Sequence, residues 1–146
     1  DNITAPTIGE TYFRRYCVPR YDELGGMLDE RKVPVFVHMD GDLKPLWKAI
    51  GDSRVEGFDS LSPPPDNDTS AGDVVRMWPT RRVFLNYPSS VHVMDPAVVY
   101  ETTRSILEQA GHSGRLEIQI SENVPPGAWK RSFPQIVRAI DEFGRP

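Results

Sequence analysis

The chain has 146 residues, of which 38% are hydrophobic and 26% charged, a composition typical of a globular protein. Its 17 Lys and Arg and 21 Asp and Glu leave a net charge of −4, which argues against nucleic acid or an anionic membrane as a partner. A single cysteine, Cys17, excludes an intramolecular disulfide and any zinc site built from several cysteines. The length of the chain predicts a single domain over residues 1–146. No stretch is long and apolar enough to span a bilayer, and we expect the protein to be located in the cytoplasm.

Strand and helix patterns alternate along the chain after an opening helix. Apolar residues at three- and four-residue steps predict this helix over residues 12–28, and Pro19 should kink or split it. Short apolar runs then predict strands over residues 33–38, 55–59, 82–86 and 116–121. The helices that follow them are predicted over residues 43–50, 74–78, 96–110 and 133–143. Asp42 and Asp95 are positioned to cap the first and third of these helices.

The alternation of strands and helices predicts a parallel sheet with right-handed crossovers. Apolar and polar residues alternate over 116–121, so one face of the last strand is polar. A parallel strand covered by helices on both faces would be apolar throughout, whereas one polar face suits the interior of a barrel. An eightfold barrel needs eight strands. The sequence therefore predicts an α/β fold, half of a TIM (β/α)8 barrel, with four parallel β/α units preceded by a helix.

Polar residues follow the predicted strands at their carboxyl ends, where β/α barrels carry their working groups. His38 and Asp40 follow the first strand and, being two residues apart, point the same way on an extended backbone. Together with Glu122 after the last strand, they could bind a divalent metal ion or form an acid–base pair. Alternatively, Asp40 only turns the chain and Glu122 is a solvated loop carboxylate.

Further strand ends supply candidates for contact with a small-molecule substrate. These candidates are Asp1, Asp59, Asn86 and Ser121, Asp1 being interpreted as the end of a strand that precedes the chain. The loop after the second strand contains three consecutive prolines at 63–65. Asp66 and Asp68 in this loop are interpreted as turn formers in preference to substrate contacts.

A half-barrel would leave two strand edges open and one face of its sheet uncovered. Phe36 and Phe84 share strand parity with His38 and Asn86, so we expect both rings on that inner face. Open edges invite pairing with another chain. The expected partner is either a missing amino-terminal half or a second copy of the chain, and the isolated chain should not be a stable, active monomer.

Several segments together resemble the uroporphyrinogen decarboxylase superfamily. They are HMDGDL at 38–43, SPPP at 62–65 with Asp68, WP at 78–79 and ISENVPP at 120–126. That superfamily comprises eightfold β/α barrels, namely the porphyrinogen decarboxylases of haem synthesis and the methyltransferases that act on methylated corrinoids. The resemblance covers essentially all 146 residues but only the carboxyl-terminal half of a family member.

The resemblance implies methyl transfer between a small methylated substrate and a corrinoid carrier, for which a corrinoid protein would be the partner. His38 matches the first zinc ligand of the methyltransferases, but Asp40 and Glu122 stand where those enzymes hold cysteines. Thiolate zinc is thereby excluded, and His38, Asp40 and Glu122 would suit one divalent ion, either zinc or a harder metal.

Two other functions remain open at this point. The first is a lyase reaction, the decarboxylation of a porphyrinogen or a small carboxylate, in which Asp1 would bind pyrrole nitrogens or transfer a proton. The second is a half-barrel without catalytic activity that binds a ligand or a partner protein.

Overall fold

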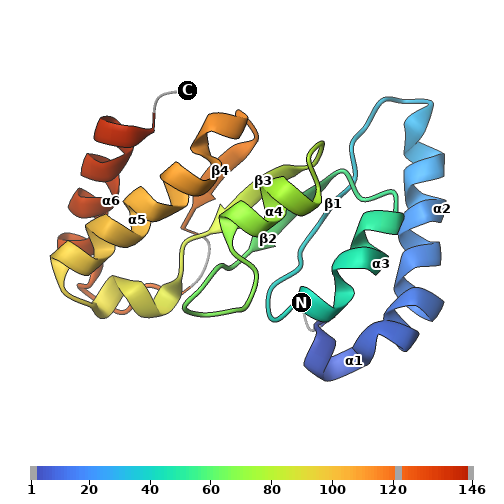
Figure 1. The fold of residues 1–146 in the computed structure, drawn as a ribbon, viewed down its shortest axis with the longest axis horizontal. Coiled ribbons are helices and arrows are strands. Elements are labelled where there is room, and N and C mark those ends of the chain that lie inside the picture. The colour runs from blue at the N-terminus through green and yellow to red at the C-terminus, as the bar shows by residue number, and fades with distance from the viewer. Residues whose placement is uncertain (1–2, 121–122, 145–146) are drawn as a thin grey trace.

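The computed structural model describes residues 3–120 and 123–144 (Figure 1). Its strands form one sheet in the order β1-β2-β3-β4, and every neighbouring pair is parallel. The predicted arrangement of four parallel strands in chain order is thus confirmed. The strands are β1 Phe36–Val37, β2 Gly57–Leu61, β3 Arg82–Asn86 and β4 Leu116–Gln119.

Helices precede β1, connect the strands and follow β4, and Figure 1 shows them as a row from α2 at one end to α6 at the other. They are α1 Ala5–Tyr12, α2 Val18–Asp29, α3 Trp47–Asp52, α4 Ala71–Met77, α5 Pro96–Ala110 and α6 Trp129–Phe143. Short 3-10 turns precede α3 and α5. Within the described part of the chain, no helix has the length and apolarity needed to cross a bilayer.

Proline divides the opening helix, as the sequence predicts. A π-helical segment, Phe13–Cys17, separates α1 from α2, and Pro19 lies in the first turn of α2. Proline is tolerated at this position because the first backbone N–H groups of a helix have no partner within it. The prediction that Asp95 caps α5 also holds, since its carboxylate accepts a hydrogen bond from the Ala97 N–H at 2.8 Å.

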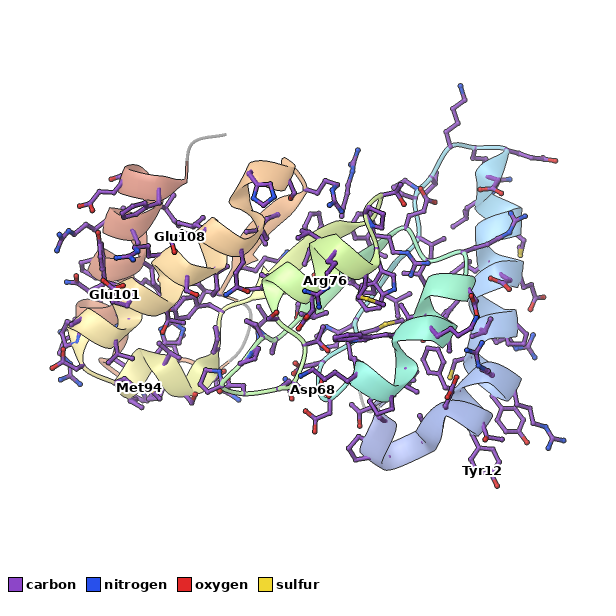
Figure 2. The ribbon with its side chains drawn as sticks, in the orientation of Figure 1. Tyr12, Asp68, Arg76, Met94, Glu101 and Glu108 are labelled. Atoms are coloured by element: carbon purple, nitrogen blue, oxygen red, sulfur yellow. The ribbon has the colours of Figure 1, made fainter. Side chains whose placement is uncertain are left out.

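The predicted cap of the helix after β1 is wrong. Asp42 does not receive the first N–H groups of this helix, and its backbone carbonyl accepts a hydrogen bond from Ala5 instead. Asp68 lies in the loop after β2 and is labelled in Figure 2. Its carboxylate accepts from the N–H groups of Leu43 at 2.8 Å and Lys44 at 3.2 Å. A carboxylate distant in sequence thus stabilises the positive end of the helical segment.

Only one face of the sheet is covered by helices. Phe58, Val83 and Leu85 point to this face, are at most 1% exposed and pack with residues of α3, α4 and α5 in one core. On the opposite face, the alternate residues Asp59 and Arg82 are exposed. The sheet therefore has a dry outer face and an open inner face.

Arg81 is a buried cation, 7% exposed, at the amino end of β3. Its guanidinium donates to the carbonyl oxygens of Ile50 at 2.7 Å, Gly51 at 3.1 Å and Ser53 at 2.9 Å. These carbonyls lie in or directly after the last turn of α3, which carries partial negative charge. Burial lowers the pKa of Arg81. The side chain fastens α3 to the sheet.

We expect Arg81→Met to lower the free energy of unfolding by about 2–4 kcal/mol, because several charge-assisted hydrogen bonds to buried carbonyls are lost. The matched control is Arg82→Met, since the neighbouring Arg82 side chain is exposed and should contribute within about 0.5 kcal/mol. Urea denaturation measures both variants. Equal losses in the two variants would show that Arg81 does not hold α3.

His92 joins α6 to the segment after β3 and is 2% exposed. Its Nδ1 lies 2.9 Å from the Ser132 hydroxyl of α6, and its ring packs between Tyr87 and Phe133. Burial lowers the pKa of His92, while the carboxylate of Asp66 opposes this shift. The folded chain therefore takes up a proton at His92 less readily than the unfolded chain does.

Because the pKa of His92 is lower in the folded chain, the unfolded chain takes up a proton first as the pH falls below about 6.5. We expect the free energy of unfolding to decrease from pH 7 towards pH 5, and His92→Asn to reduce this slope. His112→Asn is the control, since His112 is exposed. Thermal denaturation at several pH values tests this, and a slope unchanged in His92→Asn would contradict it.

Candidate functional site

The predicted site residues that the structure describes lie towards the carboxyl ends of the strands. His38 and Asp40 follow β1, Asp59 lies within β2 and Asn86 ends β3. Asp59 is exposed, whereas Asn86 is 1% exposed. The other three predicted residues, Asp1, Ser121 and Glu122, lie outside the described residues. Parallel pairing places the described candidates along one edge of the sheet.

Two hydrogen bonds join the carboxyl ends of β1 and β2. The Ser60 N–H donates to His38 Nδ1 at 3.2 Å, and the Met39 N–H donates to the Ser60 carbonyl at 3.0 Å. A neutral imidazole has one donor and one acceptor nitrogen. Because Nδ1 accepts this bond, the neutral form of His38 would carry its proton on Nε2, from which it can donate a hydrogen bond.

The loop after β2, residues 62–69, connects the other strand ends. Its Ser62 hydroxyl accepts from the Asn86 side-chain amide at 2.9 Å, and its Asn67 amide donates to the Asp40 carboxylate at 3.1 Å. Its Asp66 carboxylate accepts from the Ser90 hydroxyl in the segment after β3. These contacts fix the orientations of Asp40 and Asn86, so the edge is a connected polar network.

The observed geometry of His38 does not fit the predicted metal site. A neutral histidine that binds a metal through one nitrogen carries its proton on the other and usually donates it to an acceptor. Here Nδ1 faces a donor, so neither nitrogen of the neutral ring has a lone pair left for a metal ion. Across residues 3–120 and 123–144, no three His, Cys, Asp or Glu side chains group as metal ligands. The predicted third ligand, Glu122, is not among these residues.

Aromatic side chains lie on the inner face, as predicted. The rings of Phe36 and Phe84 stack with centroids 4.9 Å apart, and both are half-buried. Gly57 of β2 lies between them in the sheet, and a Cβ atom there would be 2.3 Å from the Phe36 ring. Glycine therefore leaves the space that allows rings of β1 and β3 to meet across β2.

Four residues of the network were not predicted as site residues from the sequence. They are Ser60, Ser62, Asn67 and Ser90. The position of Ser60 at the end of the second predicted strand was a usable signal, but serine and asparagine in a proline-rich loop also match ordinary turn chemistry. The hydroxyl of Ser60 is buried and finds no hydrogen-bond partner among the described residues.

A polar cavity of about 910 Å³ lies at the opposite, amino-terminal edge of the sheet. Charged residues of both signs line it, among them Asp29, Arg54, Glu56 and Arg82. Arg54 and Asp29 form an ion pair there. In parallel α/β sheets, ligands bind outside the carboxyl ends of the strands and not at this edge. We therefore place the candidate site at the carboxyl edge.

Comparison with known proteins finds no match, whether with protein-family models, with curated proteins or with solved structures. The motifs given above therefore carry the resemblance to the uroporphyrinogen decarboxylase superfamily by themselves.

The tautomer of His38 can be measured directly. We expect long-range ¹H–¹⁵N correlation spectra above pH 7.5 to show His38 with its proton on Nε2, because the Ser60 N–H occupies Nδ1. Exposed His112 serves as the internal reference for an unconstrained ring. A spectrum in which His38 carries its proton on Nδ1 would contradict the geometry and restore His38 as a possible metal ligand.

Proposed function

We propose that the chain is the carboxyl-terminal half of a (β/α)8 barrel enzyme similar to the uroporphyrinogen decarboxylase superfamily, and that it binds a small molecule at the carboxyl edge of β1 to β3. The supporting observation is that hydrogen bonds hold three polar side chains at this edge: His38 contacts Ser60 of β2, and Asp40 and Asn86 contact the loop after β2. The exposed carboxylate of Asp59 adds a charge on the inner face beside it. Such a network holds polar groups in fixed directions, which catalysis requires.

Of the reactions that the resemblance implies, decarboxylation agrees best with the geometry of His38. It breaks a carbon–carbon bond, releases carbon dioxide and leaves an electron pair on the substrate, whose negative charge spreads onto neighbouring atoms. A neutral imidazole can stabilise such charge by donating a hydrogen bond, without losing its proton. His38 with its proton on Nε2 is a donor of this kind.

Other side chains at this edge and on the inner face would protonate the substrate and bind the rest of it. Protonation of the substrate carbon requires an acid, and we assign this task to Asp40 after β1 or to the exposed Asp59 of β2. The buried Asn86 amide, held by Ser62, supports the floor of the site. The inner-face rings of Phe36 and Phe84 offer an apolar surface for the rest of the substrate.

Methyl transfer to a corrinoid is the second candidate function, favoured by the match of His38 to the first zinc ligand of the methyltransferases. In that reaction a bound divalent ion would activate the substrate heteroatom, and His38 would have to release Nδ1 from Ser60 to bind it. The third candidate is a half-barrel that binds a ligand without turnover.

Activity assays separate these candidates. The whole barrel protein that contains this chain as its carboxyl-terminal half is incubated with uroporphyrinogen and other small carboxylates, with carbon dioxide release as the readout, and with methylated thiols and amines plus cob(I)alamin. The isolated chain, which should be inactive, is the negative control. We expect carbon dioxide release that falls at least about 100-fold in His38→Asn, because this variant keeps an acceptor for Ser60 but loses the Nε2 donor. His38→Gln, which places an amide donor near the Nε2 position, should retain more activity.

The other outcomes are equally distinct. Methyl transfer that depends on added zinc or manganese would favour the second candidate. Carbon dioxide release unchanged in His38→Asn would remove His38 from the mechanism. Substrate binding in calorimetry without any turnover would favour the binding module.

A further inference from the structure

Both outer strands of the sheet have a free edge. β1 pairs only with β2, and β4 pairs only with β3, among the strands of the described residues. Unpaired strand edges in a folded protein are normally covered or paired by other polypeptide. The two edges together with the open inner face therefore form one continuous surface, which we call the open side.

The aromatic pair on the open side has the pattern of half a barrel layer. In closed β/α barrels, each interior layer takes four side chains from alternate strands. Phe36 and Phe84 come from the alternate strands β1 and β3, and Gly57 of the intervening β2 leaves room for them. Two further side chains, from strands outside this chain's own sheet, would complete the layer.

The edge beside β1 already carries a helix. α1 begins at the carboxyl edge, where the Ala5 N–H donates to the Asp42 carbonyl at 2.9 Å. α2 ends at the amino edge, where Asp22 and Asp29 contact Arg54. The α1–α2 segment thus runs antiparallel to β1 and lies outermost in Figure 1. This is the position of a helix that follows a strand adjacent to β1.

The edge beside β4 carries α6. α6 packs on α5, where the Tyr100 hydroxyl donates to the Glu142 carboxylate, and its outer side stays exposed. Trp129 is 50% and Val137 56% exposed there, along a groove of about 670 Å³. In a closed barrel, α6 would cover the junction between β4 and the next strand.

Exposed apolar side chains lie on the helices and loops beside both edges. On α2, α6 and their adjoining loops they are Leu24, Met27, Val33, Ile120, Trp129, Val137, Ile140 and Phe143. Contiguous exposed apolar surface of this kind marks a site of contact with another protein.

A second copy of this chain does not fit the open side. Two copies related by a twofold axis would place β4 of one beside β1 of the other. The α6 helix of one copy and the α1–α2 segment of the other would then occupy the same junction, which in a closed barrel holds one helix. A fitting partner has no helix before its first strand or after its last.

We propose that the open side binds a complementary half-barrel with four parallel strands and only the three helices that connect them, and not a second copy of this chain. This inference rests on the half-barrel architecture of the proposed function. The partner's last strand would lie beside β1 and its first strand beside β4. Its strands would then enclose the carboxyl edge of the sheet, where His38 and Asp40 lie.

Two fusion proteins test this inference. The first joins residues 33–120, which supply four strands and the three connecting helices, directly to the amino terminus of the full chain. The second, the matched control, joins two full chains through a flexible Gly/Ser linker. Both contain eight strands and differ in their helices. Sedimentation equilibrium measures association, and hydrogen exchange measures protection of the β1 and β4 amides.

We expect the first fusion to be monomeric, with amide exchange in β1 and β4 at least about tenfold slower than in the chain alone. The control should lack this protection, and the chain alone should form no discrete dimer. A discrete species of twice 16.5 kDa formed by the chain alone would overturn the choice of partner but leave the half-barrel standing. Equal protection of the β1 and β4 amides in the two fusions would overturn the argument that the additional helices exclude a second copy. If the β1 and β4 amides of the first fusion exchange as fast as in the chain alone, the half-barrel architecture is also wrong.

Discussion

Parallel pairing of four consecutive strands is the constraint on which the rest of this structure depends. Each connection must return along the sheet, and here the returning helices α3, α4 and α5 all cover the same face. Two consequences follow directly. All strands end at one edge, where the polar candidates gather, and the other face remains open, with the stacked rings of Phe36 and Phe84 upon it.

The loop after β2 converts that shared edge into a network. Through Ser62, Asn67 and Asp68 it contacts Asn86 at the end of β3, Asp40 after β1 and the first turn before α3. The same loop therefore holds the first turn before α3, the Asp40 carboxylate and the end of β3 in fixed positions relative to one another. A change in this loop would alter the directions of several polar groups together, whereas a change at an exposed helix surface would leave them in place.

Local sequence patterns determined much of the fold. β3 spans the residues 82–86 that its apolar run predicts, and α5 spans residues 96–110 between its Asp95 cap and Gly111. These elements could be predicted because their signals are adjacent in the chain: hydrophobic period, a capping carboxylate and proline or glycine at the ends. Parity along the strands likewise placed Phe36 and Phe84 on one face.

Contacts between distant residues were decided only by the tertiary structure. Asp68 caps the segment before α3 although Asp42 is the nearer carboxylate, because the β2 loop folds back over the end of β1. The proton position on His38 depends on the Ser60 N–H, which lies 22 residues away. The sequence by itself supplied the residues at the carboxyl edge. Only the packing of β1 against β2 determined whether His38 accepts or donates at Nδ1, since hydrogen-bond direction depends on the partner and not on the residue type.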